Sequence, residues 1–306
     1  MIRILRGASL VFVLVLTSAS LFGQSRLQPL PSDGTTVRDM LQQLREFREA
    51  RRAAGVGHVK GEIVSVDWSK ESFIIPVAGN VQGSNGTFFK SDVTLANRRS
   101  VPQVIAVGFL QRGVNNGNNP VQYFTIPANT TDMERDFVGN VLQRTAALGT
   151  ILVIAKTAAG SAGAVDNQAE IDGFSRIWTP QPVLAGQSAS VGSVSQSFEA
   201  IDLQDNLAES WGYGLRQDAN FRTNVGLVNL YDSANTFTIN VVGLQGSTAF
   251  QVTVQPFSME QPAVPAGVYG DMFIHVTSAS NNLNWWSAYG SSVDNATGDG
   301  WVTHVH

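Results

Sequence analysis

Aromatic side chains are the residues of this chain best suited to bind a ligand. An exposed Trp or Tyr on a sheet, surrounded by Asn and Ser, presents a flat apolar face with a polar rim that can stack against a sugar ring. Six large aromatic residues with this potential all lie in the second copy of the repeat described below, namely Trp211, Tyr213, Trp285, Trp286, Tyr289 and Trp301. We name Trp285, Trp286, Tyr289 and Trp301 as candidate ligand-binding residues. Alternatively, one of the two adjacent tryptophans fills a core, and the other lies against a neighbouring domain.

Side chains suited to catalysis or metal binding are few. The chain has no cysteine, which excludes disulfides, thiolate metal sites and a cysteine nucleophile. We find no nucleophile elbow, no His-Glu-x-x-His motif, no phosphate-binding glycine loop and no EF-hand spacing. The histidines are His58, His275, His304 and His306. We therefore predict no catalytic residue, no metal ligand and no cofactor.

Two chemical alternatives stay open. A hydrolase could use a carboxylate pair whose members lie far apart in sequence. The turn from Asp294 to Asp299 offers oxygen atoms of the kind that Ca²⁺ binds, although Asn, Gly and Asp are also the residues that a hairpin turn requires.

A nine-residue stretch returns 132 positions later and organises the chain. Phe89 to Asn97 reads Phe-Lys-Ser-Asp-Val-Thr-Leu-Ala-Asn, and Phe221 to Asn229 reads Phe-Arg-Thr-Asn-Val-Gly-Leu-Val-Asn. In both copies apolar residues alternate with polar ones, which predicts a strand with one packed face, and the phase of the alternation is preserved. The repeat indicates two copies of one unit. Asp92 becomes Asn224, so this position is not a shared acid.

Short alternating stretches separated by turn residues predict an all-β fold with two tandem antiparallel β-sandwich domains. We place the first domain at residues 58–180 and the second at 198–306, with a linker or hairpin at 181–197. Thr131 and Glu134 form a capping-box pattern, which predicts a short helix ending near Leu148 inside the first domain.

Four stretches of the sequence resemble a known class of module. These stretches are Asn85 to Asn97, Phe174 to Thr179, Leu215 to Asn229 and Val293 to Asp299. Together they resemble the tandem Ig-like β-sandwich modules of secreted, mostly uncharacterised bacterial proteins. The resemblance spans about three quarters of the chain. It implies an Ig-like fold and export, and it supplies no catalytic residues.

The N-terminal residues predict export and a helix. Arg3 and Arg6 precede an apolar run and small residues, which is typical of a secretory signal peptide at residues 1–23. We expect no transmembrane segment in the mature chain. Residues 24–57 then read as a linker followed by an amphipathic helix that Thr36 and Asp39 cap.

The helix has an apolar stripe consisting of Val37, Leu41, Leu44 and Phe47. This stripe either covers the first sandwich or binds a partner, a second copy of the chain or a membrane surface. We name its four residues as candidate partner-binding residues.

The composition and the patterns above limit which classes of function fit this chain. The formal charge of −4 gives no indication of nucleic-acid binding. The signal peptide, the repeat, the lack of a nucleophile or metal motif and the largely uncharged polar surface lead us to expect a non-catalytic structural, adhesive or assembly protein that is secreted or lies in the cell envelope. Its partners would be an envelope polysaccharide or another surface protein, with self-association possible. The first alternative is a carbohydrate-binding module that uses the second-domain aromatics, and a hydrolase is the weaker one.

Overall fold

The computed structural model describes residues 27–54, 70–83, 86–181, 189–190, 192–203, 209–279 and 285–304. The predicted signal peptide, the start of the first predicted domain at 58–69, and His58 and His306 lie outside the described residues.

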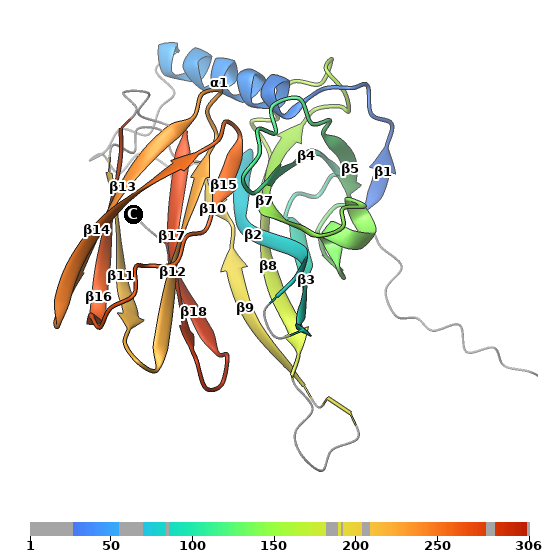
Figure 1. Ribbon diagram of the computed structural model, residues 1–306. Coiled ribbons are helices and arrows are strands. Elements are labelled where there is room, and N and C mark those ends of the chain that lie inside the picture. Colours follow the sequence, from blue (N-terminus) through green and yellow to red (C-terminus); the bar gives the residue numbers. More distant parts are fainter. Residues whose placement is uncertain are drawn as a thin grey trace, which may run out of the picture.

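The described chain is predominantly antiparallel β-structure, which confirms the all-β prediction (Figure 1). Its first part contains β1 (Gln28–Leu30), α1 (Val37–Ala53), β2 (Ser72–Gln82), β3 (Phe88–Asn97), β4 (Gln103–Gln111), β5 (Gln122–Ile126), β6 (Thr130–Glu134), the π-helix η2 (Phe137–Val141), β7 (Ala147–Lys156), β8 (Ile171–Pro180), β9 (Ser193–Glu199) and β10 (Ile201–Asp202). Its second part contains β11 (Glu209–Gln217), β12 (Phe221–Asn229), β13 (Asn235–Gly243), β14 (Gly246–Val254), β15 (Ser258–Glu260), β16 (Gly270–Ser278), β17 (Trp286–Asp294) and β18 (Gly300–His304).

The strands pair in the same order twice. In the first unit, β2 to β9, the pairing orders are β5-β4-β7-β2 and β6-β3-β8-β9. In the second unit, β11 to β18, they are β14-β13-β16-β11 and β15-β12-β17-β18. The first unit differs in that β2 also pairs with one end of β3, which joins its two sheets. Because β9 pairs with β8 and β10 pairs with β2, residues 193–202 belong to the first unit by hydrogen bonding.

Two buried asparagines show that the repeat extends to atomic detail. The Asn97 Nδ2 donates to the carbonyls of Val101, Ile126 and Pro127, and its Oδ1 accepts from the Arg99 amide. Asn229 makes the corresponding four bonds, to the carbonyls of Ser233, Val254 and Gln255 and to the Tyr231 amide. Each asparagine ties the end of a strand to the loop that follows and to a more distant segment.

Each unit has its own core, and a third core lies between them. Val93 belongs to the core of the first unit, and Val225 to the core of the second. The third cluster, which we call the shared core, joins residues of α1, the first unit and the second unit. Its members include Leu41, Ile74, Ala106, Leu152, Phe198, Val228, Met259, Trp285 and Tyr289.

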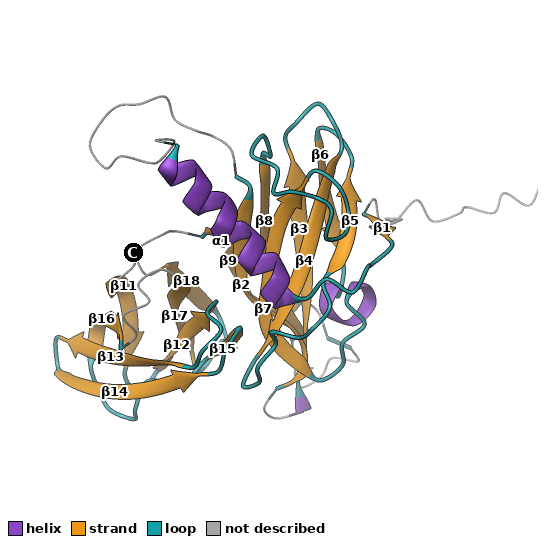
Figure 2. Ribbon diagram, turned by 90° about the horizontal axis from the view of Figure 1, so that it is seen from above, coloured by secondary structure: helices purple, strands orange, loops and turns teal. Residues whose placement is uncertain are grey.

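Helix α1 lies over the junction between the two units (Figure 2). The predicted capping box is confirmed, since the Thr36 side chain accepts from the Asp39 amide and the Asp39 carboxylate accepts from the Thr36 amide. A Cβ at Gly108 would lie 3.1 Å from side-chain atoms of Met40 and Val37, so glycine on β4 allows the close approach of the helix.

The apolar stripe of α1 is covered within the chain. Val37, Leu41 and Leu44 are fully buried, and Phe47 is half-buried under the Arg51 guanidinium. This corrects the prediction that the stripe binds a partner: the gap between two sandwich-like units supplies the apolar surroundings that an external partner would otherwise provide. No helix of the described ranges combines the length and hydrophobicity needed to cross a bilayer.

The short helix of the first unit was predicted in the wrong place. Thr130–Glu134, which carries the capping-box pattern, is strand β6 and pairs with β3. The helical turn begins only at Phe137, after Asp136 adopts a left-handed conformation and accepts a bond from the Gly139 amide. Pairing with the organising strand therefore outweighs the local preference for a helix.

A buried lysine should make the free energy of unfolding depend on pH. Lys156 at the end of β7 is 2% exposed, and its ammonium donates to the Gln43 side chain of α1. Burial lowers the pKa of Lys156, and the charge of Asp33 opposes this shift. Between the native and the unfolded pKa, the unfolded chain binds more protons, so this residue makes the free energy of unfolding rise with pH.

We expect Lys156→Met to be at least as stable as the wild type near pH 7, because methionine keeps the volume without a buried charge. Its advantage should shrink as the pH rises towards the ordinary pKa of lysine, because the wild-type side chain becomes neutral in the native state before it does so in the unfolded chain. Urea unfolding of both proteins across this range measures the difference. A variant that loses more than about 1 kcal/mol near pH 7 would show that the bond to Gln43 outweighs the burial of charge.

Candidate binding surface

Three of the four predicted ligand-binding residues are buried. Trp285 lies in the shared core beneath the guanidinium groups of Arg45 and Arg48, and Trp286 lies in the second core against Phe237. Tyr289 is fully buried. The prediction that these three residues bind a ligand is therefore corrected, and the alternative assignment of the adjacent tryptophans is confirmed. The physical reason is that β17 has a core on both of its faces.

The fit of Tyr289 depends on a glycine. A Cβ on Gly226 of β12 would lie 1.9 Å from the Tyr289 ring, so the ring rests directly on the backbone. It also packs edge-on against Phe198 of β9, with ring centroids 5.4 Å apart. Burial raises the pKa of the Tyr289 hydroxyl, which has no hydrogen-bond partner among the described residues. Tyr289 therefore contributes to the junction of the units.

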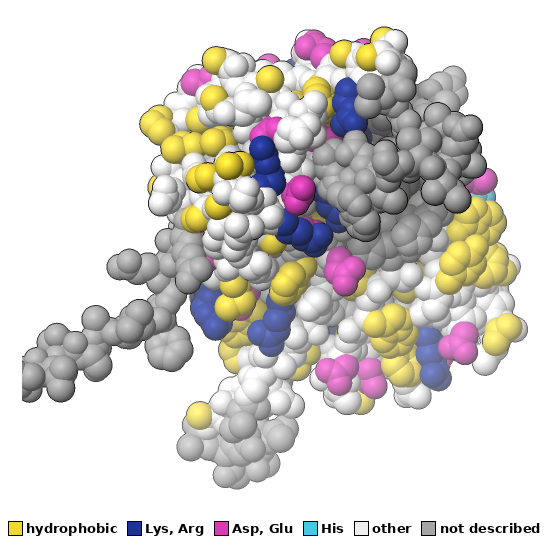
Figure 3. All heavy atoms as spheres, turned by 180° about the vertical axis from the view of Figure 1, so that it is seen from behind, with side chains coloured by type: hydrophobic (Ala, Val, Ile, Leu, Met, Phe, Trp, Pro, Cys, Tyr) yellow, Lys and Arg dark blue, Asp and Glu magenta, His cyan; other side chains and the backbone are white. Residues whose placement is uncertain are grey.

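The outer face of the second unit carries a different group of aromatic residues. Trp211 and Tyr213 of β11 and Phe273 and His275 of β16 form what we call the aromatic surface. The Trp211 and His275 rings stack with centroids 3.9 Å apart, and Phe273 lies 5.7 Å from Trp211 and 6.0 Å from Tyr213. Tyr213 is 61% exposed. Figure 3 shows hydrophobic side chains gathered beside a histidine at the margin of this unit.

Strand alternation places these side chains outside. In β16, Met272, Ile274 and Val276 point into the second core, which leaves Phe273 and His275 on the opposite face. Trp211 and Tyr213 are not among the four ligand-binding residues predicted from sequence. The alternation along β16 is the signal that would have placed Phe273 and His275 beside them.

Trp301 extends this surface around the edge of the sandwich. It is 39% exposed, and its indole Nε1 donates to the Gly214 carbonyl at 2.7 Å, directly after Tyr213. Its ring contacts Phe221 at 5.8 Å between centroids, and the Arg216 guanidinium lies 4.4 Å from the Phe221 ring centre. Trp301 is thus the predicted site residue that the structure leaves accessible.

Polar groups surround the aromatic surface. The neighbouring strands β13, β14 and β16 contribute polar side chains with hydroxyl or amide groups. These are Thr238, Asn240, Gln251 and Thr277. The carboxylate of the neighbouring Glu209 accepts a hydrogen bond from the His275 Nε2 at 2.7 Å. The surface therefore combines ring faces with uncharged hydrogen-bonding groups.

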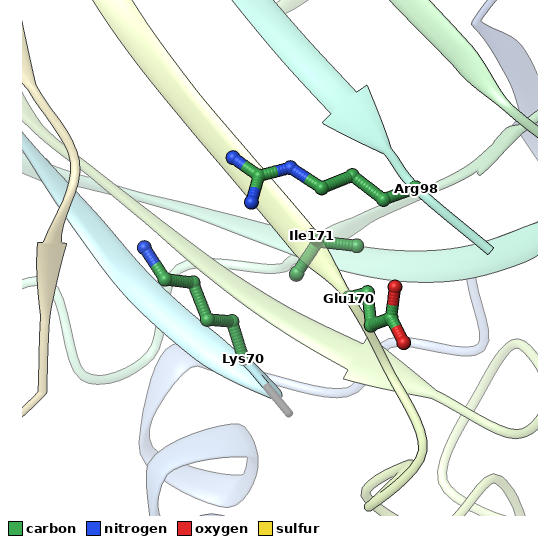
Figure 4. A pocket seen from close by; sticks show the side chains of 4 residues that line it. All are labelled: Lys70, Arg98, Glu170 and Ile171. Carbon is green, nitrogen blue, oxygen red and sulfur yellow. The ribbon is translucent and has the colours of Figure 1, made fainter. Parts of the chain in front are cut away.

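A pocket in the first unit gathers charged groups (Figure 4). It has a volume of about 280 Å³ and is lined by Lys70, Arg98, Glu170 and Ile171. Arg98 pairs with Asp172 at 2.7 Å, and the Lys70 ammonium lies 3.6 Å from Asp172 and 3.7 Å from Asp202. Burial raises the pKa of Asp202, and Lys70 opposes the shift. The pocket therefore places the carboxylates Asp172 and Asp202 beside the cations Lys70 and Arg98, and Glu170 completes its charged lining.

The turn considered for calcium is a hairpin between β17 and β18. The Asp294 carboxylate accepts from the amides of Ala296 and Thr297, and backbone bonds join Asp294 to Gly298 and Asp299. Across the part of the chain that the structure describes, no three His, Asp or Glu side chains come together in a way that could hold a metal ion.

Comparison of the chain with protein-family models, with curated proteins and with solved structures finds no match.

Proposed function

We propose that this protein is an exported, non-catalytic structural or adhesive protein of the cell surface or extracellular space. The observation that supports this most is the shared core: α1 and the facing sheets bury one continuous apolar cluster and so join the two units rigidly. In this proposal each unit is an Ig-like module, which the matched strand orders support.

Further contacts between the units strengthen the junction. The Ser258 hydroxyl of β15 donates to the Gln111 carbonyl at the end of β4, and the Asn116 amide group donates to the Phe257 carbonyl. Gln196 of β9 bonds to Ser291 of β17. A rigid pair of units suits a protein that carries a binding surface on a fixed support, since little ordering is needed when a partner binds.

Expression of the full chain in a bacterial host, followed by fractionation and N-terminal sequencing, tests the proposal. We expect a mature chain cleaved between Ala19 and Gly23 that is retained on washed envelope material. An uncleaved chain in the cytoplasm, or a mature chain found only as a lone monomer with no retention on envelope material, would contradict it.

A second candidate function is carbohydrate binding, and the exposure of the aromatic surface favours it. None of the four residues of this surface is among the four predicted from sequence, although the predicted Trp301 lies beside it.

A further inference from the structure

We propose that the aromatic surface, formed by Trp211, Tyr213, Phe273 and His275, binds a neutral polysaccharide. This inference deepens the proposed function, because it names the ligand class of a surface that the rigid scaffold carries.

The strand registers allow the two units to be compared position by position. Each unit has a bulge at the same place, between Ile75 and Ala78 in β2 and between Gly212 and Leu215 in β11. One position before the bulge, Ile74 pairs with Leu152 and Trp211 pairs with His275. Trp211 therefore takes the place of Ile74, and His275 the place of Leu152.

The comparison continues along the neighbouring strands. Ala106 pairs with Ile154 in the first unit, and Thr238 pairs with Thr277 in the second. Asn240, which pairs with His275, takes the place of Gly108. The face that α1 and the second unit cover in the first unit thus has an uncovered counterpart. In it, aromatic rings and hydroxyl groups replace Ile74, Leu152, Ala106 and Ile154, whereas Val242, which pairs with Phe273, keeps the apolar character of Leu110.

This replacement pattern indicates the kind of ligand. If this face contacted only solvent, we would not expect Trp211, Tyr213 and Phe273 to lie together, because a contiguous exposed apolar patch usually marks an interaction site. A face that repeats the packing of the shared core with a second copy of the chain would keep aliphatic residues such as Ile74 and Leu152. Rings surrounded by Thr, Asn and Gln instead match a ligand that has apolar C–H faces and many hydroxyl groups, which is the chemistry of a sugar.

The charges of the surface match a neutral ligand. Glu209 and His275 contact each other, and Arg216, which lies opposite Asp271 in the register of β11 and β16, forms an ion pair with Asp218 at 2.7 Å. No cation of this surface is free to attract an acidic polymer among the described residues that form it. Tyr213 and the neighbouring Trp301 are the most accessible rings, so we assign them the first contact with the sugar units.

Pull-down of the purified mature protein with insoluble cellulose, chitin and β-1,3-glucan tests the inference, together with titration of soluble oligomers of the polymers that bind. We expect retention on at least one polymer. Tyr213→Ala and Trp211→Ala should each weaken binding roughly tenfold, which corresponds to about 1.4 kcal/mol.

Phe174→Ala is the matched control, because Phe174 is 38% exposed on the outer face of the first unit and lies away from the aromatic surface. It should bind like the wild type. Thermal unfolding of each variant checks folding, and Tyr213→Phe, which keeps the ring, should retain most of the binding.

Two results would overturn the inference. One is a wild-type protein that passes through all three polymers. The other is a dimer in sedimentation analysis that Tyr213→Ala dissociates, which would assign the surface to a second copy. In either case retention on envelope material can persist, so the inference can fail while the proposed function stands. A chain that stays in the cytoplasm but still binds a polymer would contradict the proposed function and leave this inference standing.

Discussion

Replacing Leu41 of α1 by alanine should lower the free energy of unfolding by about 2–5 kcal/mol. Leu41 is fully buried in the shared core, where residues of both units meet the helix. Its truncation leaves a cavity in a cluster that includes Ala106 and Leu152 of the first unit and Trp285 of the second. Urea unfolding, followed by far-ultraviolet circular dichroism and by tryptophan fluorescence, measures the loss.

The same experiment tests whether α1 joins the units. We expect the wild type to unfold in a single transition, because the shared core couples the two units, and Leu41→Ala to separate the transitions seen by the two probes. Gln42→Ala is the control, since Gln42 is exposed on the opposite face of the helix, and it should change stability by less than about 0.5 kcal/mol. A Leu41→Ala protein as stable as the control would mean that α1 does not hold the units together.

Asn97→Ala and Asn229→Ala should each cost about 3 kcal/mol of stability. Each side chain is buried, donates to three backbone carbonyls and accepts from one backbone amide, so alanine leaves several polar groups without a partner. Thermal and urea unfolding of both variants give the values, which we expect to agree within about 1 kcal/mol.

This pair of variants tests the duplication, because it compares one interaction in two places. Asn167→Ala, at an exposed loop position, is the control and should be nearly neutral. If one of the two buried asparagines could be removed at little cost while the other could not, the two units would not use the repeated stretch in the same way.

The structure also shows how duplicated units can diverge in use. In the first unit the outer face of the sheet that contains β2, β4 and β7 is covered by α1 and by the second unit. In the second unit the corresponding face is open and carries aromatic and polar residues. One fold therefore supplies a packing face in one copy and a candidate binding face in the other.

The sequence alone determined the local structure where one pattern acts without competition. The period-two alternation and its preserved phase predicted the organising strands β3 and β12, and the Thr36–Asp39 pair predicted the start of α1. These signals are local, since a strand face and a helix cap depend on residues only a few positions apart. The repeat also predicted two copies of one unit, which appear as the same strand order.

Only the tertiary structure decided which side chains reach solvent. Trp285, Trp286 and Tyr289 are buried because β17 has the second core on one face and the shared core on the other, and the stripe of α1 is buried because two units meet there. The Thr131 pattern became a strand because β3 lies beside it. In each case the deciding contact joins residues that are far apart in sequence, and a local pattern cannot show whether the face it creates will meet protein or water.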